Sequence, residues 1–105
     1  MTWTEFDAVV RANHRFLISS HVNPDGDCIG SQLAMAWYLK SQRKEVVIYD
    51  IDPVPYKFAF LTDADTITTI RPEAPFDVLV VLDSSNLSRL GWEGAEHCAS
   101  TIINI

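Results

Sequence analysis

Apolar and polar positions along the chain fall into blocks that predict alternating strands and helices. Short apolar runs rich in β-branched residues are typical of buried strands, whereas apolar residues spaced three or four apart predict helices. Strands are expected at residues 15–20, 45–50, 77–83 and 100–105, with a polar edge strand at residues 65–70. Continuous apolar strands separated by helical patterns are typical of parallel sheets. We therefore predict an α/β fold with a mostly parallel sheet flanked by helices, in a Rossmann-like three-layer arrangement.

Two helical patterns lie on either side of the first expected strand. Residues 4–13 predict a helix for which Thr4 is the expected N-cap. A second helix is expected to begin near Cys28 and to end in the polar run at residues 40–44. Shorter helical segments or turns are expected at residues 51–61, which contain two prolines, and at residues 84–91.

The length and net charge of the chain limit the functions with which it is compatible. A chain of 105 residues forms one small domain. Its net charge of −6 disfavours binding of duplex DNA, because Lys and Arg make most phosphate contacts. A small phosphorylated substrate held by metal ions is still compatible with this charge. The N-terminus lacks the features of a signal peptide, and no apolar stretch is long enough to span a bilayer. We expect no membrane association, a cytoplasmic location and reduced thiols at Cys28 and Cys98.

Imidazole and carboxylate side chains follow the expected strands. His21, Asp25 and Asp27 come directly after the first strand, and Asp83 ends the strand at residues 77–83. The carboxyl ends of parallel strands meet at one edge of a sheet, where α/β proteins bind ligands. Three converging carboxylates repel one another unless a cation neutralises them. Oxygen and imidazole ligands suit Mn²⁺ or a similar divalent ion, and no cysteine is placed to form a thiolate zinc site.

Local structural roles are the alternative for these residues. Pro24, Asp25 and Gly26 form a typical β-turn sequence, and Asp27 could cap the following helix. Asp50 and Asp52 are interpreted as loop and turn residues. Surface positions are predicted for His14 and His97, and packing roles for Trp3, Trp37, Tyr38 and Trp92.

Other ligand-binding motifs are absent. An EF-hand loop beginning at Asn23 would need Gly at the position of Cys28 and Glu at the position of Ala34. The chain contains neither the glycine-rich dinucleotide motif nor the P-loop motif. It also lacks the G-x-S-x-G sequence of a nucleophilic serine. These absences leave metal-assisted chemistry as the hypothesis with the most support from the residues.

Two segments resemble motifs of the DHH phosphoesterase superfamily. The segment "HVNPDGDCIGS" is similar to the first motif, a His followed by Pro-Asp-x-Asp and then by Gly-Ser at the start of a helix. The segment "DVLVVLDSSNLSRLG" is similar to the second motif, a buried strand that ends in Asp and is followed by Arg-x-Gly. The first motif most resembles that of the nanoRNase branch, the bifunctional oligoribonuclease and pAp phosphatase proteins.

The resemblance implies a site for two metal ions. His21 and Asp25 are expected to bind one Mn²⁺, Asp27 to bind the second, and Asp83 to bridge them. Asp27 and Asp83 are then the catalytic residues, and Mg²⁺ or another divalent ion could replace Mn²⁺. Two such ions lower the pKa of a bridging water and stabilise charge on the phosphoryl group.

Two further residues are candidates for substrate binding. Ser31 near the start of the second helix is expected to position a phosphate, or to be an ordinary helix-start serine. Arg89 is expected to contact a substrate phosphate, since its guanidinium suits phosphate oxygens, or to pair with a neighbouring acidic residue.

The resemblance covers the whole chain, whereas the chain covers only part of the family pattern. The third motif, Asp-His-His, is expected directly after "TIINI", and a fourth-motif Asp and a C-terminal substrate domain should follow. Residues 1–105 are therefore interpreted as the N-terminal portion of a DHH phosphoesterase domain. With those ligands missing, the fragment itself is expected to be inactive.

The implied activity of the complete protein is Mn²⁺-dependent hydrolysis of short oligoribonucleotides to 5′-mononucleotides, or of pAp to AMP. Its partners are then a short oligonucleotide or nucleotide phosphoester and a second copy in a homodimer. Alternatives within the superfamily are a cyclic-dinucleotide phosphodiesterase, a RecJ-like single-strand exonuclease and an inorganic pyrophosphatase. A non-catalytic nucleotide-binding domain is the alternative of a different class. Hydrolysis that depends on a divalent metal would distinguish the enzyme from such a binding domain.

Overall fold

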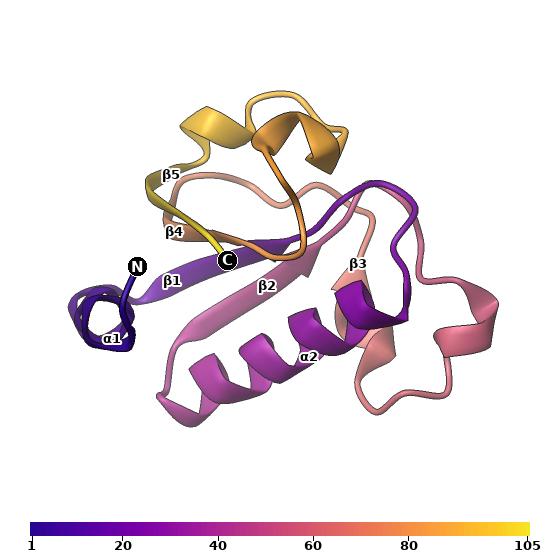
Figure 1. Cartoon of the computed structure of the whole chain (residues 1–105), viewed down its shortest axis with the longest axis horizontal. Helices are drawn as coiled ribbons and strands as arrows, with labels where there is room; N and C mark the ends of the chain where they lie inside the picture. Colours follow the sequence, from indigo (N-terminus) through magenta and orange to yellow (C-terminus); the bar gives the residue numbers. More distant parts are fainter.

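The computed structural model describes all residues 1–105 and places a five-stranded sheet at the centre of the molecule (Figure 1). The α-helices are α1 (Trp3–Ala12) and α2 (Gly26–Ser41). The strands are β1 (Arg15–Ser19), β2 (Glu45–Tyr49), β3 (Ile67–Thr68), β4 (Phe76–Val81) and β5 (Ala99–Asn104). Four short 3₁₀ helices complete the fold: η1 (Tyr56–Phe58), η2 (Ala64–Thr66), η3 (Leu87–Leu90) and η4 (Ala95–His97).

All strand pairs are parallel, in the order β3-β2-β1-β4-β5. The first strand is therefore central, with β2 on one side and β4 on the other. Chain segments that follow β1, β2 and β4 consequently meet at the same edge of the sheet. We call this edge, where the strands end, the carboxyl edge, and the opposite one the amino edge. The predicted α/β class and parallel pairing are confirmed.

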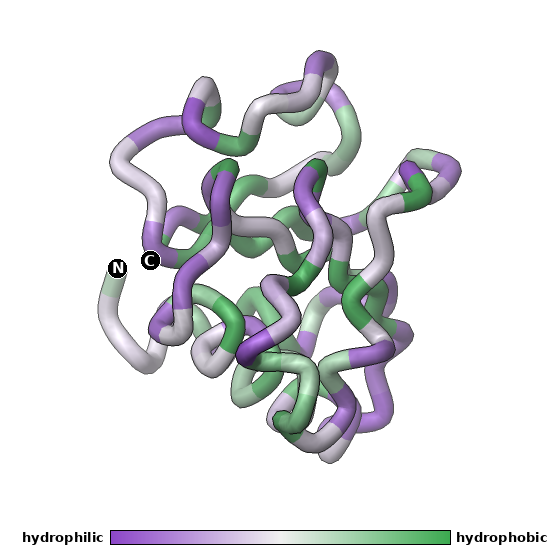
Figure 2. Tube along the Cα trace, turned by 90° about the vertical axis from the view of Figure 1, so that its right-hand side faces the viewer, coloured by the Kyte–Doolittle hydropathy of each residue, from purple (hydrophilic) through white to green (hydrophobic).

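Each face of the sheet carries its own apolar core. Alternate residues of β1 point to opposite faces, so Phe16 and Ile18 pack with α1 and α2 while Leu17 packs under η3 and η4. Figure 1 shows α1 and α2 on one side of the strands and the short η3 and η4 segments on the other. Figure 2 shows hydrophobic and hydrophilic stretches alternating along the whole chain. The molecule thus has three layers, with one layer built mainly from 3₁₀ turns.

The helix starts differ from the predictions. Thr2, not Thr4, caps α1, because the Thr2 side chain accepts the Glu5 N–H at 3.2 Å and Glu5 bonds back in a capping box. Helix α2 begins at Gly26, two residues earlier than predicted. Its N-cap is Asp25, whose Oδ1 accepts the Cys28 N–H at 2.9 Å, so the capping role predicted for Asp27 is wrong.

Several other elements are shorter than predicted. The polar edge strand is confirmed as β3, but only Ile67 and Thr68 pair with β2. The short helical segments or turns predicted at residues 51–61 and 84–91 are confirmed as the 3₁₀ turns η1 and η3. Packing is confirmed for Trp92, which is buried, whereas Trp3 and Trp37 are 67% and 73% exposed. These two rings do not serve the core, although Trp3 contacts the rings of Phe6 and Tyr38.

Candidate metal centre

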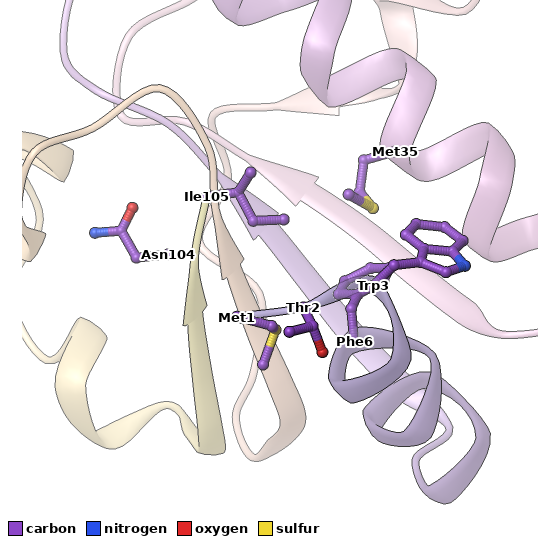
Figure 3. Close-up of a pocket in the computed structure, with 7 residues that line it drawn as sticks. All are labelled: Met1, Thr2, Trp3, Phe6, Met35, Asn104 and Ile105. Atoms are coloured by element: carbon purple, nitrogen blue, oxygen red, sulfur yellow. The ribbon is translucent and has the colours of Figure 1, made fainter.

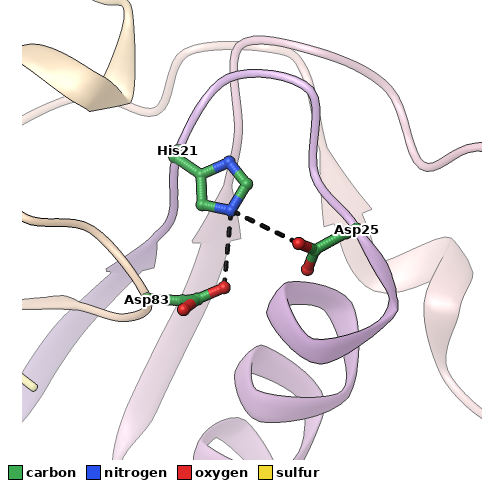
Figure 4. Close-up of side chains that lie close together, drawn as sticks. All are labelled: His21, Asp25 and Asp83. Atoms are coloured by element: carbon green, nitrogen blue, oxygen red, sulfur yellow. Dashed lines mark ion pairs between the residues drawn. The ribbon is translucent and has the colours of Figure 1, made fainter.

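Three side chains from separate elements converge at the carboxyl edge (Figure 4). His21 Nε2 lies 3.4 Å from Asp83 Oδ2 and 4.0 Å from Asp25 Oδ2. One ligand atom from each residue lies within 4.8 Å of the other two, which is close enough for a single cation to contact all three. His21 is buried, whereas both aspartates are exposed. The cluster therefore sits at the surface with a buried imidazole at its base.

The backbone places each of these side chains for a different local reason. His21 follows the end of β1 by two residues, and Asp83 follows the end of the adjacent β4 by two residues. Asp25 reaches the cluster as the N-cap of α2: its Oδ1 caps the helix while its Oδ2 faces His21. Capping and convergence are thus compatible roles for one carboxylate. Asp83 has a left-handed φ of 55°, a conformation that Asp tolerates better than most residues.

The hydrogen bond of the imidazole decides what the cluster can hold. His21 Nδ1 lies 2.6 Å from the Val22 carbonyl oxygen, and a carbonyl only accepts, so Nδ1 carries a proton. The other nitrogen, Nε2, is then directed at two carboxylate oxygens. Three acceptors that face one another require either a second proton on the imidazole or a cation between them. A divalent cation fits this donor set, because metal-binding histidines usually donate their other ring N–H to a carbonyl or carboxylate.

The second predicted motif supports the loop that carries His21. The Val22 N–H donates to the Arg89 carbonyl oxygen at 2.8 Å, which joins the first loop to η3. Gly91 ends η3 with φ +78°, and a Cβ built there would lie 2.3 Å from Val22 Cγ1. Only glycine fits this close approach without displacing Val22, the neighbour of His21.

Three of the predicted site residues lie outside the converging cluster. Asp27 is exposed in the first turn of α2 and is not within ligand distance of the other three. Ser31 is exposed and lines an apolar groove with Phe6 and Tyr38. Arg89 is exposed and forms no ion pair, so the alternative of pairing with a neighbouring acid is not observed.

Asp50 is the residue whose burial the sequence interpretation missed. It lies in the loop directly after β2, as interpreted, but it is fully buried, and its Oδ1 accepts from Ser20 N at 2.9 Å and from Gln32 Nε2 at 2.8 Å. Burial raises the pKa of the Asp50 carboxyl above its usual 3.8, while the two hydrogen bonds oppose that shift. Its position after β2 was the available signal, since the same argument from strand ends correctly placed Asp83.

A hollow on the surface lies away from the converging cluster. A groove of about 510 Å³ is lined by Met1, Thr2, Trp3, Phe6, Met35, Asn104 and Ile105 (Figure 3). None of these side chains ionises, and none belongs to the converging cluster. Charge and donor chemistry therefore favour the carboxyl edge, not this groove, as the functional centre.

The parallel sheet and the imidazole–carboxylate cluster at its carboxyl edge define an α/β protein with a candidate divalent-metal centre. Comparison of the sequence with models of protein families identifies its family. The model of the DHH family, N-terminal domain, matches residues 15–105. The chain belongs to the DHH family.

A solved structure shares the fold. The crystal structure of an exopolyphosphatase-related protein from Bacteroides fragilis matches with a TM-score of 0.76 and 22% sequence identity. The match covers 96% of this chain and 37% of that protein, so the chain spans little more than a third of its structural neighbour. No curated protein matches the sequence. No helix is long and apolar enough to cross a membrane.

Proposed function

We propose that this chain is the N-terminal part of a divalent-metal-dependent phosphoesterase that hydrolyses short oligoribonucleotides to 5′-mononucleotides or pAp to AMP. The observation that carries the proposal is the approach of His21 Nε2 to oxygens of Asp25 and Asp83. Membership of the DHH family and the resemblance of the first motif to that of the nanoRNase branch support the substrate class.

Four residues of this chain would serve as ligands of two metal ions. His21, Asp25 and Asp83 would hold one Mn²⁺, and Asp83 would share a second ion with Asp27. When bound, such ions lower the pKa of a water and stabilise the charge that develops on a phosphoryl group. The hydrogen bond from His21 Nδ1 to Val22 keeps the imidazole turned so that Nε2 faces the carboxylates.

Substrate recognition needs positive charge close to this acidic cluster. Arg89 is exposed, lies next to the loop of His21 through the bond from Val22 N, and has no acidic partner. We propose that its guanidinium binds a phosphate oxygen of the substrate. The second proposed contact, from Ser31, has less support, because Ser31 faces the groove beside Phe6 and Tyr38.

The proposal extends to the protein around this chain. Two metal ions need more ligands than Asp27 and the converging cluster supply, so we propose that a third motif, a fourth-motif Asp and a substrate domain follow Ile105. The limited share of the Bacteroides fragilis protein that the chain covers supports a longer chain. We also propose a cytoplasmic homodimer. Sequencing the gene past the codon for Ile105 tests the longer chain, and an immediate stop codon would contradict it.

The decisive experiment compares Asp83→Asn with Asp65→Asn in the longer protein. Asn tolerates the left-handed backbone at position 83, so the variant removes the charge without straining the turn. Asp65 is an exposed aspartate in η2, away from the cluster, and serves as the control. We expect Mn²⁺-stimulated hydrolysis of a ribodinucleotide and of pAp to fall at least about 100-fold in Asp83→Asn only.

Two outcomes would contradict the proposed activity. Hydrolysis by Asp83→Asn at the wild-type rate would exclude Asp83 as a metal ligand. Nucleotide binding that survives EDTA, with no hydrolysis by the wild type, would instead identify a non-catalytic nucleotide-binding domain.

A further inference from the structure

The buried polar side chains of this protein are gathered in one place. Nearly all buried residues are apolar, and the buried polar or charged residues are Ser19, Ser20, His21, Gln32 and Asp50. The carboxyl ends of β1 and β2 carry four of them, and α2 carries the fifth. Burial of polar groups costs free energy unless they are hydrogen-bonded, so a cluster of this kind calls for a specific reason.

Ser20 links the two strand ends that precede metal-ligand candidates. Its N–H donates to Asp50 Oδ1 at 2.9 Å, and its hydroxyl donates to the Leu82 carbonyl oxygen at 2.7 Å. Ser20 directly precedes His21, and Leu82 directly precedes Asp83. The backbone direction at both candidate ligands therefore depends on this serine.

Gln32 connects helix α2 to the Asp50 carboxylate. Its Nε2 donates to Asp50 Oδ1 at 2.8 Å from the second turn of α2, the helix that Asp25 caps. One carboxylate oxygen of Asp50 therefore receives a donor from the β1 end and a donor from α2. Through Ser20 it is also connected to the β4 end. The elements that carry His21, Asp25 and Asp83 are thus linked through Asp50, two of them directly and the end of β4 through Ser20.

Burial of the Asp50 carboxyl costs free energy that its contacts do not fully offset. It is fully buried, no positively charged side chain pairs with it, and its second oxygen, Oδ2, has no hydrogen-bond partner. A buried carboxylate with an unsatisfied oxygen contributes less stability than an apolar residue of similar size would. Its value to the protein must then lie in the arrangement that it imposes.

We propose that Asp50 is a positioning residue for the metal centre, which holds the end of β1 and helix α2 so that His21, Asp25 and Asp83 converge on one cation. The inference rests on the proposed function, since it assumes that the cluster binds a divalent ion. Asp50 acts through Ser20 and Gln32 and does not contact the ion.

The test compares Asp50→Ala with Asp77→Ala in the longer protein. Asp77 is a matched control, because its Oδ2 accepts two backbone N–H groups, of His14 and Arg15, at the other end of β1. Binding of Mn²⁺ is measured from the electron paramagnetic resonance signal of the free ion. We expect about tenfold weaker binding in Asp50→Ala, the effect typical of residues that orient metal ligands, and unchanged binding in Asp77→Ala.

Two further variants keep the test decisive. Asp50→Asn retains an oxygen acceptor for Ser20 and Gln32, so we expect it to bind Mn²⁺ within about threefold of the wild type. Gln32→Met has a similar shape but lacks the amide donor, and we expect about threefold weaker binding. If Asp50→Ala does not fold, Gln32→Met decides: wild-type affinity in that variant would overturn the proposal.

A measurement without metal separates this inference from the proposed function. The ring nitrogen chemical shifts of His21, recorded by NMR in metal-free protein, should move in Asp50→Ala and stay in place in Asp77→Ala. If the wild type binds Mn²⁺ no better than Asp83→Asn, the metal centre fails while the shifts still establish the positioning. If Mn²⁺ binds but Asp50→Ala behaves like Asp77→Ala in both measurements, the positioning role is wrong and the metal centre stands.

Discussion

The two ends of β1 are fixed by aspartates that use the same hydrogen-bond chemistry in opposite surroundings. At the amino edge, Asp77 accepts the N–H groups of His14 and Arg15 in contact with water, and these bonds lower its pKa. At the carboxyl edge, Asp50 accepts an N–H of Ser20 and the Gln32 amide, yet burial raises its pKa. Desolvation thus outweighs two hydrogen bonds.

This difference separates a structural edge from a candidate functional one. The amino edge is held by exposed groups, including the Arg15–Glu45 ion pair at 2.6 Å, that water could replace at small cost. The carboxyl edge concentrates buried polar groups and backbone strain around His21 and Asp83. Proteins place such costs where geometry has to be held for ligands.

The largest expected effect is at Gly91, which packs against Val22 at the carboxyl edge; Gly94, the other left-handed glycine, serves as the comparison. Gly91→Ala should lower the free energy of unfolding by about 3 kcal/mol, because its Cβ meets Val22 at 2.3 Å and its φ is +78°. Gly94→Ala should cost only about 1 kcal/mol, because its Cβ meets the mobile end of Arg71. Urea unfolding of both variants measures the difference, and equal losses would contradict close packing at the carboxyl edge.

The two aspartates should differ in what their removal costs. Asp50→Ala leaves the buried donors of Ser20 and Gln32 without an acceptor, so we expect a loss of about 2 kcal/mol in the free energy of unfolding. Asp77→Ala exposes its two N–H donors to water, and we expect a clearly smaller loss. A larger loss in Asp77→Ala, measured by thermal or urea unfolding, would reverse the assignment of the buried and exposed edges.

Protonation of Asp77 at the amino edge should lower the stability of the fold in acid. Hydrogen bonds from Arg15 and His14 lower the pKa of Asp77 below the usual 3.8, so the folded state holds this proton less tightly than the unfolded chain. The resulting stability is present above the unfolded-state pKa and is lost as pH falls through the folded-state pKa. Below about pH 4, the urea midpoint should therefore fall less steeply in Asp77→Asn than in the wild type. Parallel pH profiles would exclude this contribution.

The smallest effect concerns the two cysteines, both of which are free and buried. Burial raises the pKa of the Cys28 thiol to about 11 and also raises that of Cys98. Because the thiolate is the reactive form, Cys28 should react with Ellman's reagent roughly 100-fold more slowly than in the unfolded chain at pH 8, and Cys98 should also react more slowly. Fast reaction of Cys28 alone would show that the carboxyl edge opens locally.

The sequence predicts most of the fold because burial patterns are local. The apolar runs that contain Phe16, Ile48 and Val80 had to be strands between two covered faces, and parallel pairing followed from the helical segments between them. The same logic placed His21 and Asp83 at one edge. Helix starts were predicted less well, because Thr2 and Asp25 each had a competing neighbour of similar capping chemistry.

The sequence by itself determined the strands, their parallel pairing and a group of candidate ligands after them. Only the tertiary structure decided which candidates meet: His21, Asp25 and Asp83 converge, whereas Asp27, exposed in the first turn of α2, is not part of that cluster. It also decided that Asp50 is buried, because burial depends on β1 and α2 closing over the end of β2. Periodicity describes one segment at a time, and neither convergence nor desolvation exists until separate segments are packed together.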